Sequence, residues 1–143
     1  RGVVLCLEPL APEETDFLNT AAEAARMVRE INSPSLRLLL DVKAMSSESI
    51  SIPDLIRANA SLLTHFHAND ANKRGPGFGD TDFGPIGAAL REIGYQGWVS
   101  VEVFDFSPDP LTIARESIKY LRSVASGHAA EDEQLTQPKG ALE

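Results

Sequence analysis

The sequence is poor in cysteine and has no long apolar run. Its single cysteine, Cys6, excludes a disulfide within the chain, and a reducing, cytoplasmic location is the expected one. No apolar run approaches the roughly 20 residues that a membrane-spanning helix needs. No secretory signal pattern precedes the first apolar run either. These absences predict a soluble globular protein without a membrane partner.

Basic residues are also scarce. Thirteen lysines and arginines stand against 21 aspartates and glutamates, which gives a formal net charge of -8. Binding to a nucleic-acid backbone requires clustered lysine and arginine, so the charge balance argues against a nucleic acid as the main partner. Carboxylates that meet without a cation repel one another. The acidic excess is therefore compatible with a bound metal.

What the sequence does contain is an alternation of short apolar runs with helix-like segments. At 143 residues the chain is one domain or less. The apolar runs that read as β-strands cover residues 3–8, 36–41, 62–67 and 97–103. Helical patterns follow them at about 16–31, after Pro53, at 82–94 and at 109–124. This alternation predicts four βα units with parallel strands, which is half of an eight-stranded TIM barrel.

The boundaries of the domain follow from the same periodicity. The first helix is expected to begin at Thr15 or Asp16, with an apolar stripe of Phe17, Leu18, Ala21, Ala25, Val28 and Ile31. Periodicity is lost after the last helix, so the domain is expected to cover residues 1–124. Residues 125–143 are predicted to be a disordered tail.

Four residues able to bind a metal stand at the C-terminal ends of the four predicted strands. Glu8, Asp41, His67 and Glu102 are separated by 33, 26 and 35 residues. Taken singly, each could be a solvated residue at the rim of a sheet. Because the C-terminal ends of parallel strands share one rim, the common position of all four favours a single cluster.

This mixed set of oxygen and nitrogen ligands suits a divalent metal. Mn²⁺ is favoured by the majority of oxygen ligands, and Mg²⁺, Co²⁺ or Zn²⁺ are alternatives. His65 lies two residues before His67, so it faces the same side of the strand one layer deeper. It is either a hydrogen-bonded interior histidine or a substrate contact. Cys6 stands in the same relation to Glu8, and packing in the core is its expected role.

A long loop separates the third predicted strand from the next helix. Residues 69–81 are rich in glycine and in basic or polar side chains. Loops of this length inside compact domains are usually functional or disordered. The segment HFHANDANKRGPGFGDTDFGPIGAALREIGYQGWVSVEVF, which contains this loop, resembles the C-terminal part of the sugar phosphate isomerase/epimerase family. These are xylose-isomerase-like TIM barrels that include the ketose 3-epimerases.

The resemblance extends from residue 3 to about residue 122. The segment from Phe17 to Ala22 and the pair Leu40-Asp41 are also similar to that family. The most specific motif is His67 through Gly79, followed by Gly94-Tyr95-x-Gly97 and Glu102. The resemblance implies the C-terminal half of a TIM barrel. The remaining half-barrel, or a second chain, is then an expected partner.

The resemblance also implies roles for individual residues. Glu8, Asp41, His67 and Glu102 match the metal ligands, and Glu8 and Glu102 match the acid and base of the epimerases. Residues expected to contact or line the substrate site are Arg74, Asp70, Asn72, His65 and Lys43. The implied function is a metal-dependent isomerase or epimerase of a sugar or sugar phosphate, which acts through an enediolate.

One position departs from the family pattern. Epimerases usually carry a histidine three residues after the equivalent of Asp41, and this chain has Ala44 there. Lys43 is a possible substitute, or the substrate differs. A lyase such as inosose dehydratase is therefore kept as an alternative, as is an inactive barrel fragment that needs a partner. A hydrolase of abasic DNA shares the fold class, but it needs more metal ligands and a basic surface.

Overall fold

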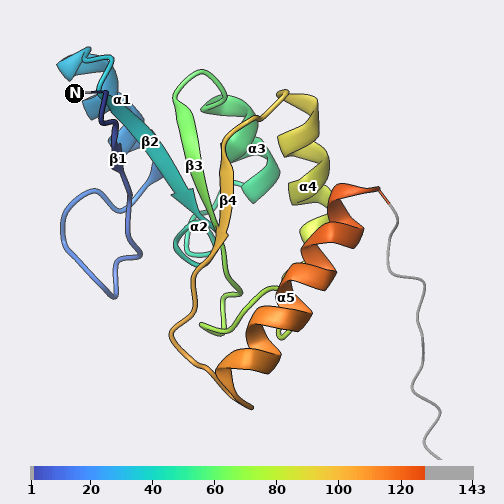
Figure 1. Ribbon diagram of the computed structural model, residues 1–143. Helices are drawn as coiled ribbons and strands as arrows, with labels where there is room; N and C mark the ends of the chain where they lie inside the picture. The colour runs from blue at the N-terminus through green and yellow to red at the C-terminus, as the bar shows by residue number, and fades with distance from the viewer. Residues whose placement is uncertain (1, 128–143) are drawn as a thin grey trace, which may run out of the picture.

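The computed structural model describes residues 2–127 and shows a four-stranded parallel sheet with helices packed against it (Figure 1). In chain order the elements are β1 (Leu5–Leu7), α1 (Ala21–Ile31), β2 (Leu36–Asp41), α2 (Val42–Met45), α3 (Ile52–Ala58), β3 (Leu63–Ala68), α4 (Phe83–Glu92), β4 (Trp98–Val101) and α5 (Pro110–Ala125). The strands are adjacent in the order β1-β2-β3-β4, and every neighbouring pair is parallel. The predicted parallel βα repeat is therefore confirmed.

One face of the sheet carries the hydrophobic core. In β2 and β3 the side chains of Leu38, Leu40, Phe66 and Ala68 are buried, because alternate residues of a strand point to the same face. They pack against apolar side chains of the helices, which are Ala21, Ala24, Ala25, Leu55, Ile56, Phe83, Ile86 and Ala89. The residues between them face the other side of the sheet. That side is therefore available for polar groups.

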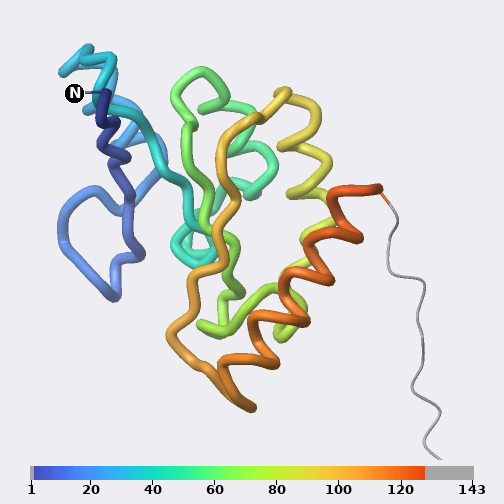
Figure 2. The backbone as a smooth tube through the Cα atoms, viewed as in Figure 1, coloured from blue at the N-terminus to red at the C-terminus, as the bar shows by residue number. Residues whose placement is uncertain are grey.

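The segments that follow the four strands lie at the same end of the sheet. Figure 2 shows these segments together toward the lower part of the view. They are the loop after β1, the short helix α2, the loop between β3 and α4, and the loop between β4 and α5. Parallel pairing brings these segments together although they are far apart in the sequence. This end of the sheet holds every residue predicted to bind a metal.

The first helix begins later than the sequence predicts. Helix α1 starts at Ala21 rather than near Asp16, and Leu18, three residues before the helix, has a left-handed backbone with φ of 57°. The Thr20 hydroxyl accepts the Glu23 N–H, and the Glu23 carboxylate accepts the Thr20 N–H. This capping box fixes the helix start. Phe17, which was assigned to the apolar stripe, is exposed.

Two other boundaries matter for the site. Strands β1 and β4 are shorter than predicted, so Glu8 and Glu102 each lie one residue beyond the end of a strand. The single helical turn α2, which the sequence pattern did not reveal, begins directly after Asp41. The predicted loop over residues 69–81 is confirmed, because no helix or strand lies between β3 and α4.

The last helix ends one residue after the predicted domain boundary. Helix α5 runs from Pro110 to Ala125 and is capped by Ser126. The rest of the predicted tail, residues 128–143, lies outside the described residues. No helix within residues 2–127 combines the length and the apolar character needed to cross a membrane.

The two edge strands expose apolar side chains. Along β1 and the residues before it, Val3, Val4 and Leu5 are exposed, and along β4 the same is true of Trp98 and Val99. The exposed fraction of Trp98 is 79%. Edge strands also present unpaired backbone N–H and C=O groups. Both edges of this sheet are therefore suited to pairing with further strands.

The capping box at α1 leads to a stability prediction. Thr20→Ala removes the hydroxyl that accepts the Glu23 N–H, and loss of such a cap costs about 1 kcal/mol. Urea unfolding followed by circular dichroism should show this decrease in the free energy of unfolding. Lys119→Ala, at an exposed position of α5, is the control and should change it by less than about 0.5 kcal/mol. Equal effects of the two substitutions would contradict the assignment of the cap.

Candidate functional site: a carboxylate and imidazole cluster

Four side chains converge where the strands end. Glu8, Asp41, His67 and Glu102 each place one ligand atom so that all four atoms lie within 4.8 Å of one another. The His67 Nδ1 atom is 3.2 Å from a Glu8 oxygen, 3.2 Å from a Glu102 oxygen and 3.6 Å from Asp41 Oδ2. These are the four residues that the sequence predicted to meet.

The curvature of the sheet makes this convergence possible. His67 is paired with Asp41 in the neighbouring strand, so these two side chains are adjacent by register. Glu8 and Glu102 come from opposite edges, three strand spacings apart, which would be about 14 Å in a flat sheet. Their carboxylates nevertheless both approach His67 to 3.2 Å. The sheet must therefore be concave on the face that carries the cluster.

Exposure differs strongly among the four side chains. Asp41 is 1% exposed and His67 15%, whereas Glu8 is 26% and Glu102 40% exposed. The Asp41 carboxylate accepts the Ala44 N–H at 2.8 Å through Oδ1 and the Asn69 side-chain N–H at 2.6 Å through Oδ2. Asp41 is thus fixed at the base of the cluster. The two glutamates lie nearer to solvent.

The charges of the cluster are strongly coupled. The Asp41 and Glu8 carboxylates raise the pKa of His67 to about 10, since they stabilise the imidazolium form. Burial raises the pKa of Glu102, and the nearby negative charges of Glu8 and Asp41 add to this effect. Three acidic groups in this space therefore need a positive charge among them. The raised pKa of His67 favours its protonated, positively charged form beside these carboxylates.

His65 lies one layer below the cluster, as predicted. Its Nε2 atom shares a hydrogen bond of 2.9 Å with the Ser100 hydroxyl, and its ring stands edge-on to that of His67 at 5.2 Å between centroids. Burial lowers the pKa of His65, and the charge of His67 lowers it further. These contacts fit the interior role that the sequence left open. A contact of His65 with substrate stays a prediction.

Lys43 lies at the rim beside the cluster. Its Nζ atom is 2.6 Å from a Glu14 oxygen and 4.8 Å from the centre of the Phe104 ring. The side chain thus connects the segment after β1 with the segment after β4. Ala44, at the position where the family pattern has a histidine, is buried and donates its N–H to Asp41.

The loop after β3 is held together by the residues that were predicted to line the substrate site. Asp70 is buried and accepts the Thr81 hydroxyl at 3.0 Å, and the Asn72 side chain donates to the Phe78 carbonyl. The Arg74 guanidinium donates to the Ser107 carbonyl at 2.6 Å and 3.1 Å. All three therefore have bonds within the protein. Their roles toward a substrate stay predictions.

One buried polar residue that contacts the cluster was not predicted from the sequence. Asn69 directly follows β3, is completely buried, and bonds to both Asp41 and the Lys43 backbone. The predicted strand ended at residue 67, whereas β3 extends to Ala68, so Asn69 lies directly after the strand only in the structure. No sequence pattern marks this residue, because its role depends on hydrogen bonds to α2 that only the folded structure brings together.

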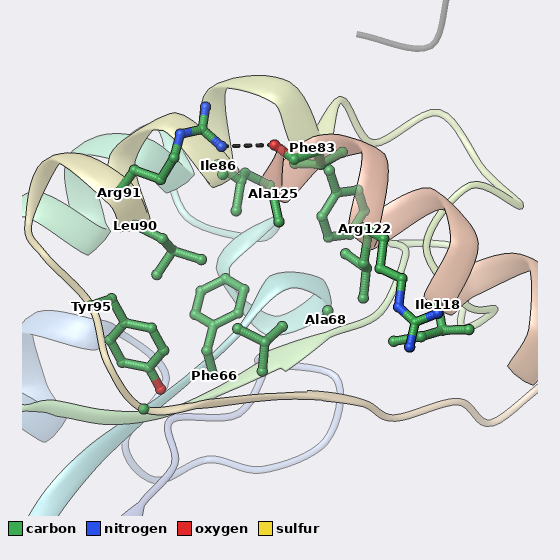
Figure 3. Close-up of a pocket in the computed structure, with 15 residues that line it drawn as sticks. Phe66, Ala68, Phe83, Ile86, Leu90, Arg91, Tyr95, Ile118, Arg122 and Ala125 are labelled. Atoms are coloured by element: carbon green, nitrogen blue, oxygen red, sulfur yellow. Dashed lines mark hydrogen bonds between the residues drawn. The ribbon is translucent and has the colours of Figure 1, made fainter. Parts of the chain in front are cut away.

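A cavity of about 350 Å³ lies apart from the cluster, on the helix side of the sheet (Figure 3). Its walls are mostly apolar and come from β3, β4, α4 and α5, with Phe66, Leu90 and Ile118 among them. Arg91 spans one side and donates to the Val124 carbonyl at 2.7 Å. No member of the cluster lines this space. Its apolar walls do not match the hydroxyl groups of a sugar.

Comparison with known proteins identifies the fold family. A family profile described as the xylose isomerase-like TIM barrel matches residues 1–124. D-psicose 3-epimerase of Agrobacterium fabrum is 41% identical over 103 residues, which cover 72% of this chain and 36% of that protein. 3-Dehydro-D-guloside 4-epimerase of Escherichia coli is 32% identical over 122 residues, which cover 85% of this chain and 47% of that protein.

A solved structure shows a similar fold. The crystal structure of a D-psicose 3-epimerase in the presence of D-fructose matches with a TM-score of 0.80 at 32% identity. The match covers 88% of this chain and 50% of that chain, so this chain spans about a third to a half of the length of these relatives. The resemblance and the partial-barrel fold predicted from the sequence are both confirmed. The chain belongs to the family of xylose isomerase-like TIM barrels.

Proposed function

We propose that this chain forms the metal-binding and acid-base part of an isomerase or epimerase that acts on a sugar or sugar phosphate. The observation that carries the proposal is the convergence of Glu8, Asp41, His67 and Glu102 at the strand ends. The relatives support the reaction class. Psicose is a 2-ketose that is inverted at position 3, and the 3-dehydro sugar is inverted at position 4. In both, the inverted carbon is next to a carbonyl.

The donor set fits a divalent cation. Three carboxylates and an imidazole within 4.8 Å of one another form a site that a single ion can fill, and a cation relieves their repulsion. We propose Mn²⁺ because oxygen ligands are in the majority, with Mg²⁺, Co²⁺ and Zn²⁺ as alternatives. The ion would supply Lewis-acid stabilisation of negative charge on the substrate oxygens.

The two glutamates are the proposed acid and base. They come from opposite edges of the sheet and are the most exposed members of the cluster, so they can reach a substrate from two sides. One carboxylate removes the proton from the carbon beside the carbonyl, which leaves an enediolate. The other glutamate, as the carboxylic acid, returns a proton to the opposite face of that carbon. The net result is inversion of one carbon.

The substrate is held differently from the family pattern. Ala44 is buried and offers only a methyl group, whereas Lys43 places a cation at the mouth of the site. We propose that Lys43 and Arg74 contact the substrate, together with Asp70, Asn72 and His65. Because the usual histidine is absent, a lyase that acts on an inosose is the second candidate. Both reactions begin with removal of a proton next to a carbonyl, and only the lyase releases water.

The remaining strands of the barrel are the proposed partner. Relatives are two to three times longer than the matched segment, and both sheet edges expose apolar side chains. We propose that a further half-barrel, either in a longer polypeptide or in a second chain, pairs with β1 and β4. A cytoplasmic location, expected from the cysteine content, stays a prediction.

Metal titration tests the proposed site. The wild-type chain, treated with chelator and then titrated with Mn²⁺ in a calorimeter, should bind one ion. Asp41→Asn should weaken binding more than about 100-fold, since loss of a direct ligand costs more than loss of a ligand's hydrogen-bond partner. Glu116→Gln, on the exposed surface of α5, is the matched control and should bind as the wild type does. Absence of stoichiometric binding by the wild type would contradict the proposed function.

Deuterium exchange tests the proposed chemistry. With Mn²⁺ in D₂O, the chain should incorporate deuterium next to the carbonyl of a ketose such as D-psicose or D-fructose, and chelation should stop the exchange. Glu102→Gln should lower the rate by about 10²- to 10⁴-fold, the usual contribution of an acid-base group. Mass spectrometry of the product separates epimerisation from loss of water. Metal binding without exchange into any ketose would contradict the acid-base roles for this chain.

Trp98 gives a test of the proposed partner surface. It is the only tryptophan of the sequence and lies exposed on the edge strand β4. If the edges pair, the fluorescence of Trp98 should shift to shorter wavelength as the chain concentration rises, while sedimentation shows association. A compact monomer that melts cooperatively, with an unshifted spectrum at every concentration, would exclude a need for a partner.

A further inference from the structure

Asn69 connects three elements at the floor of the cluster. It directly follows β3 and its side chain is completely buried. Its Nδ2–H donates to Asp41 Oδ2 at 2.6 Å, and its Oδ1 accepts the Lys43 N–H at 2.8 Å. Only one orientation of the amide satisfies both bonds. The flipped amide would set oxygen against oxygen and N–H against N–H.

The bond to Lys43 has a structural purpose. The first N–H groups of a helix have no partner within the helix. At the start of α2, Asp41 Oδ1 accepts the Ala44 N–H and Asn69 accepts the Lys43 N–H. Asn69 therefore joins the end of β3 to the first turn of α2. This contact holds α2 against the sheet.

The bond to Asp41 has a different consequence. The oxygen that Asn69 contacts, Oδ2, is also the one that lies 3.6 Å from His67 Nδ1, and so it faces the other members of the cluster. Hydrogen bonds to both carboxylate oxygens, from Ala44 on one side and Asn69 on the other, prevent the carboxylate from rotating. Because Asp41 is 1% exposed, water cannot readily replace a lost donor.

We propose that Asn69 is a positioning residue that holds Asp41 Oδ2 toward the shared space and thereby sets the affinity of the cluster for a divalent ion. The inference rests on the proposed function, since it concerns the same cluster. Partners that orient a ligand typically contribute 10- to 100-fold to metal affinity. We expect Asn69 to contribute within that range, in addition to its contribution to folding.

The test compares metal affinity with stability in Asn69→Ala. Calorimetric titration with Mn²⁺ should show binding about 10- to 100-fold weaker than in the wild type. Absorption spectra with Co²⁺ should show altered band positions or intensities, because the geometry of the Asp41 ligand changes. Urea unfolding of the metal-free protein measures the structural effect separately.

Asn59→Ala is the matched control. Asn59 is also buried. It caps the C-terminal end of α3, where its side chain donates to the Leu55 carbonyl, and neither residue belongs to the cluster. This variant should lose stability but keep the affinity and the Co²⁺ spectrum of the wild type. If Asn69→Ala does not fold, Asn69→Ser takes its place, since a shorter hydroxyl cannot keep both bonds.

The outcomes distinguish failure of the proposed metal-binding function from failure of the positioning role of Asn69. If the wild type binds no divalent ion, the proposed function fails, and the role of Asn69 falls with it. If the wild type binds and the Asn69 variant binds within about twofold of it, with an unchanged Co²⁺ spectrum, Asn69 is only structural and the positioning role is overturned. Weaker binding with a changed spectrum, alongside unchanged binding by Asn59→Ala, supports the positioning role.

Discussion

The contact of three carboxylates with the imidazole of His67 is the interaction on which the proposed site depends. Such a group of like charges is unfavourable unless a positive charge lies among them. The pKa of His67, raised to about 10, shows how strongly the neighbouring carboxylates attract that charge. The concave sheet, the capped turn α2 and the pairing of Asp41 with His67 across β2 and β3 all bring these side chains together. In the proposed function, a divalent cation takes the place of the His67 proton.

The members of the cluster differ in how firmly they are fixed and in how accessible they are to solvent. Asp41 is buried and bonded through both oxygens, whereas Glu8 and Glu102 reach solvent from opposite edges. A ligand with fixed geometry preserves the site, and accessible carboxylates can exchange protons with a substrate. Most of the hydrophobic core packs between the other face of the sheet and the helices. The side chains of the cluster are therefore largely separate from the apolar packing that supports the fold.

The repeating pattern of strands and helices predicted the residues whose place in the site follows from their position in the repeat. The strand ends identified Glu8, Asp41, His67 and Glu102, because parallel strands place their C-terminal residues at one rim. The pattern did not predict two features that depend on individual hydrogen bonds, which are the start of α1 and the contacts of Asn69. Apolar periodicity placed the start of α1 too early, although the Thr20 and Glu23 capping box was visible in the sequence. The bonds of Asn69 depend on the geometry of α2, a turn too short to show periodicity.

The most direct measurement of the central claim is anomalous X-ray diffraction from crystals of this chain grown with Mn²⁺, recorded at the manganese absorption edge. The account predicts one strong peak between Glu8, Asp41, His67 and Glu102, with ligand atoms at about 2.0–2.3 Å. Four side chains directed apart, or a peak located elsewhere on the molecule, would contradict it.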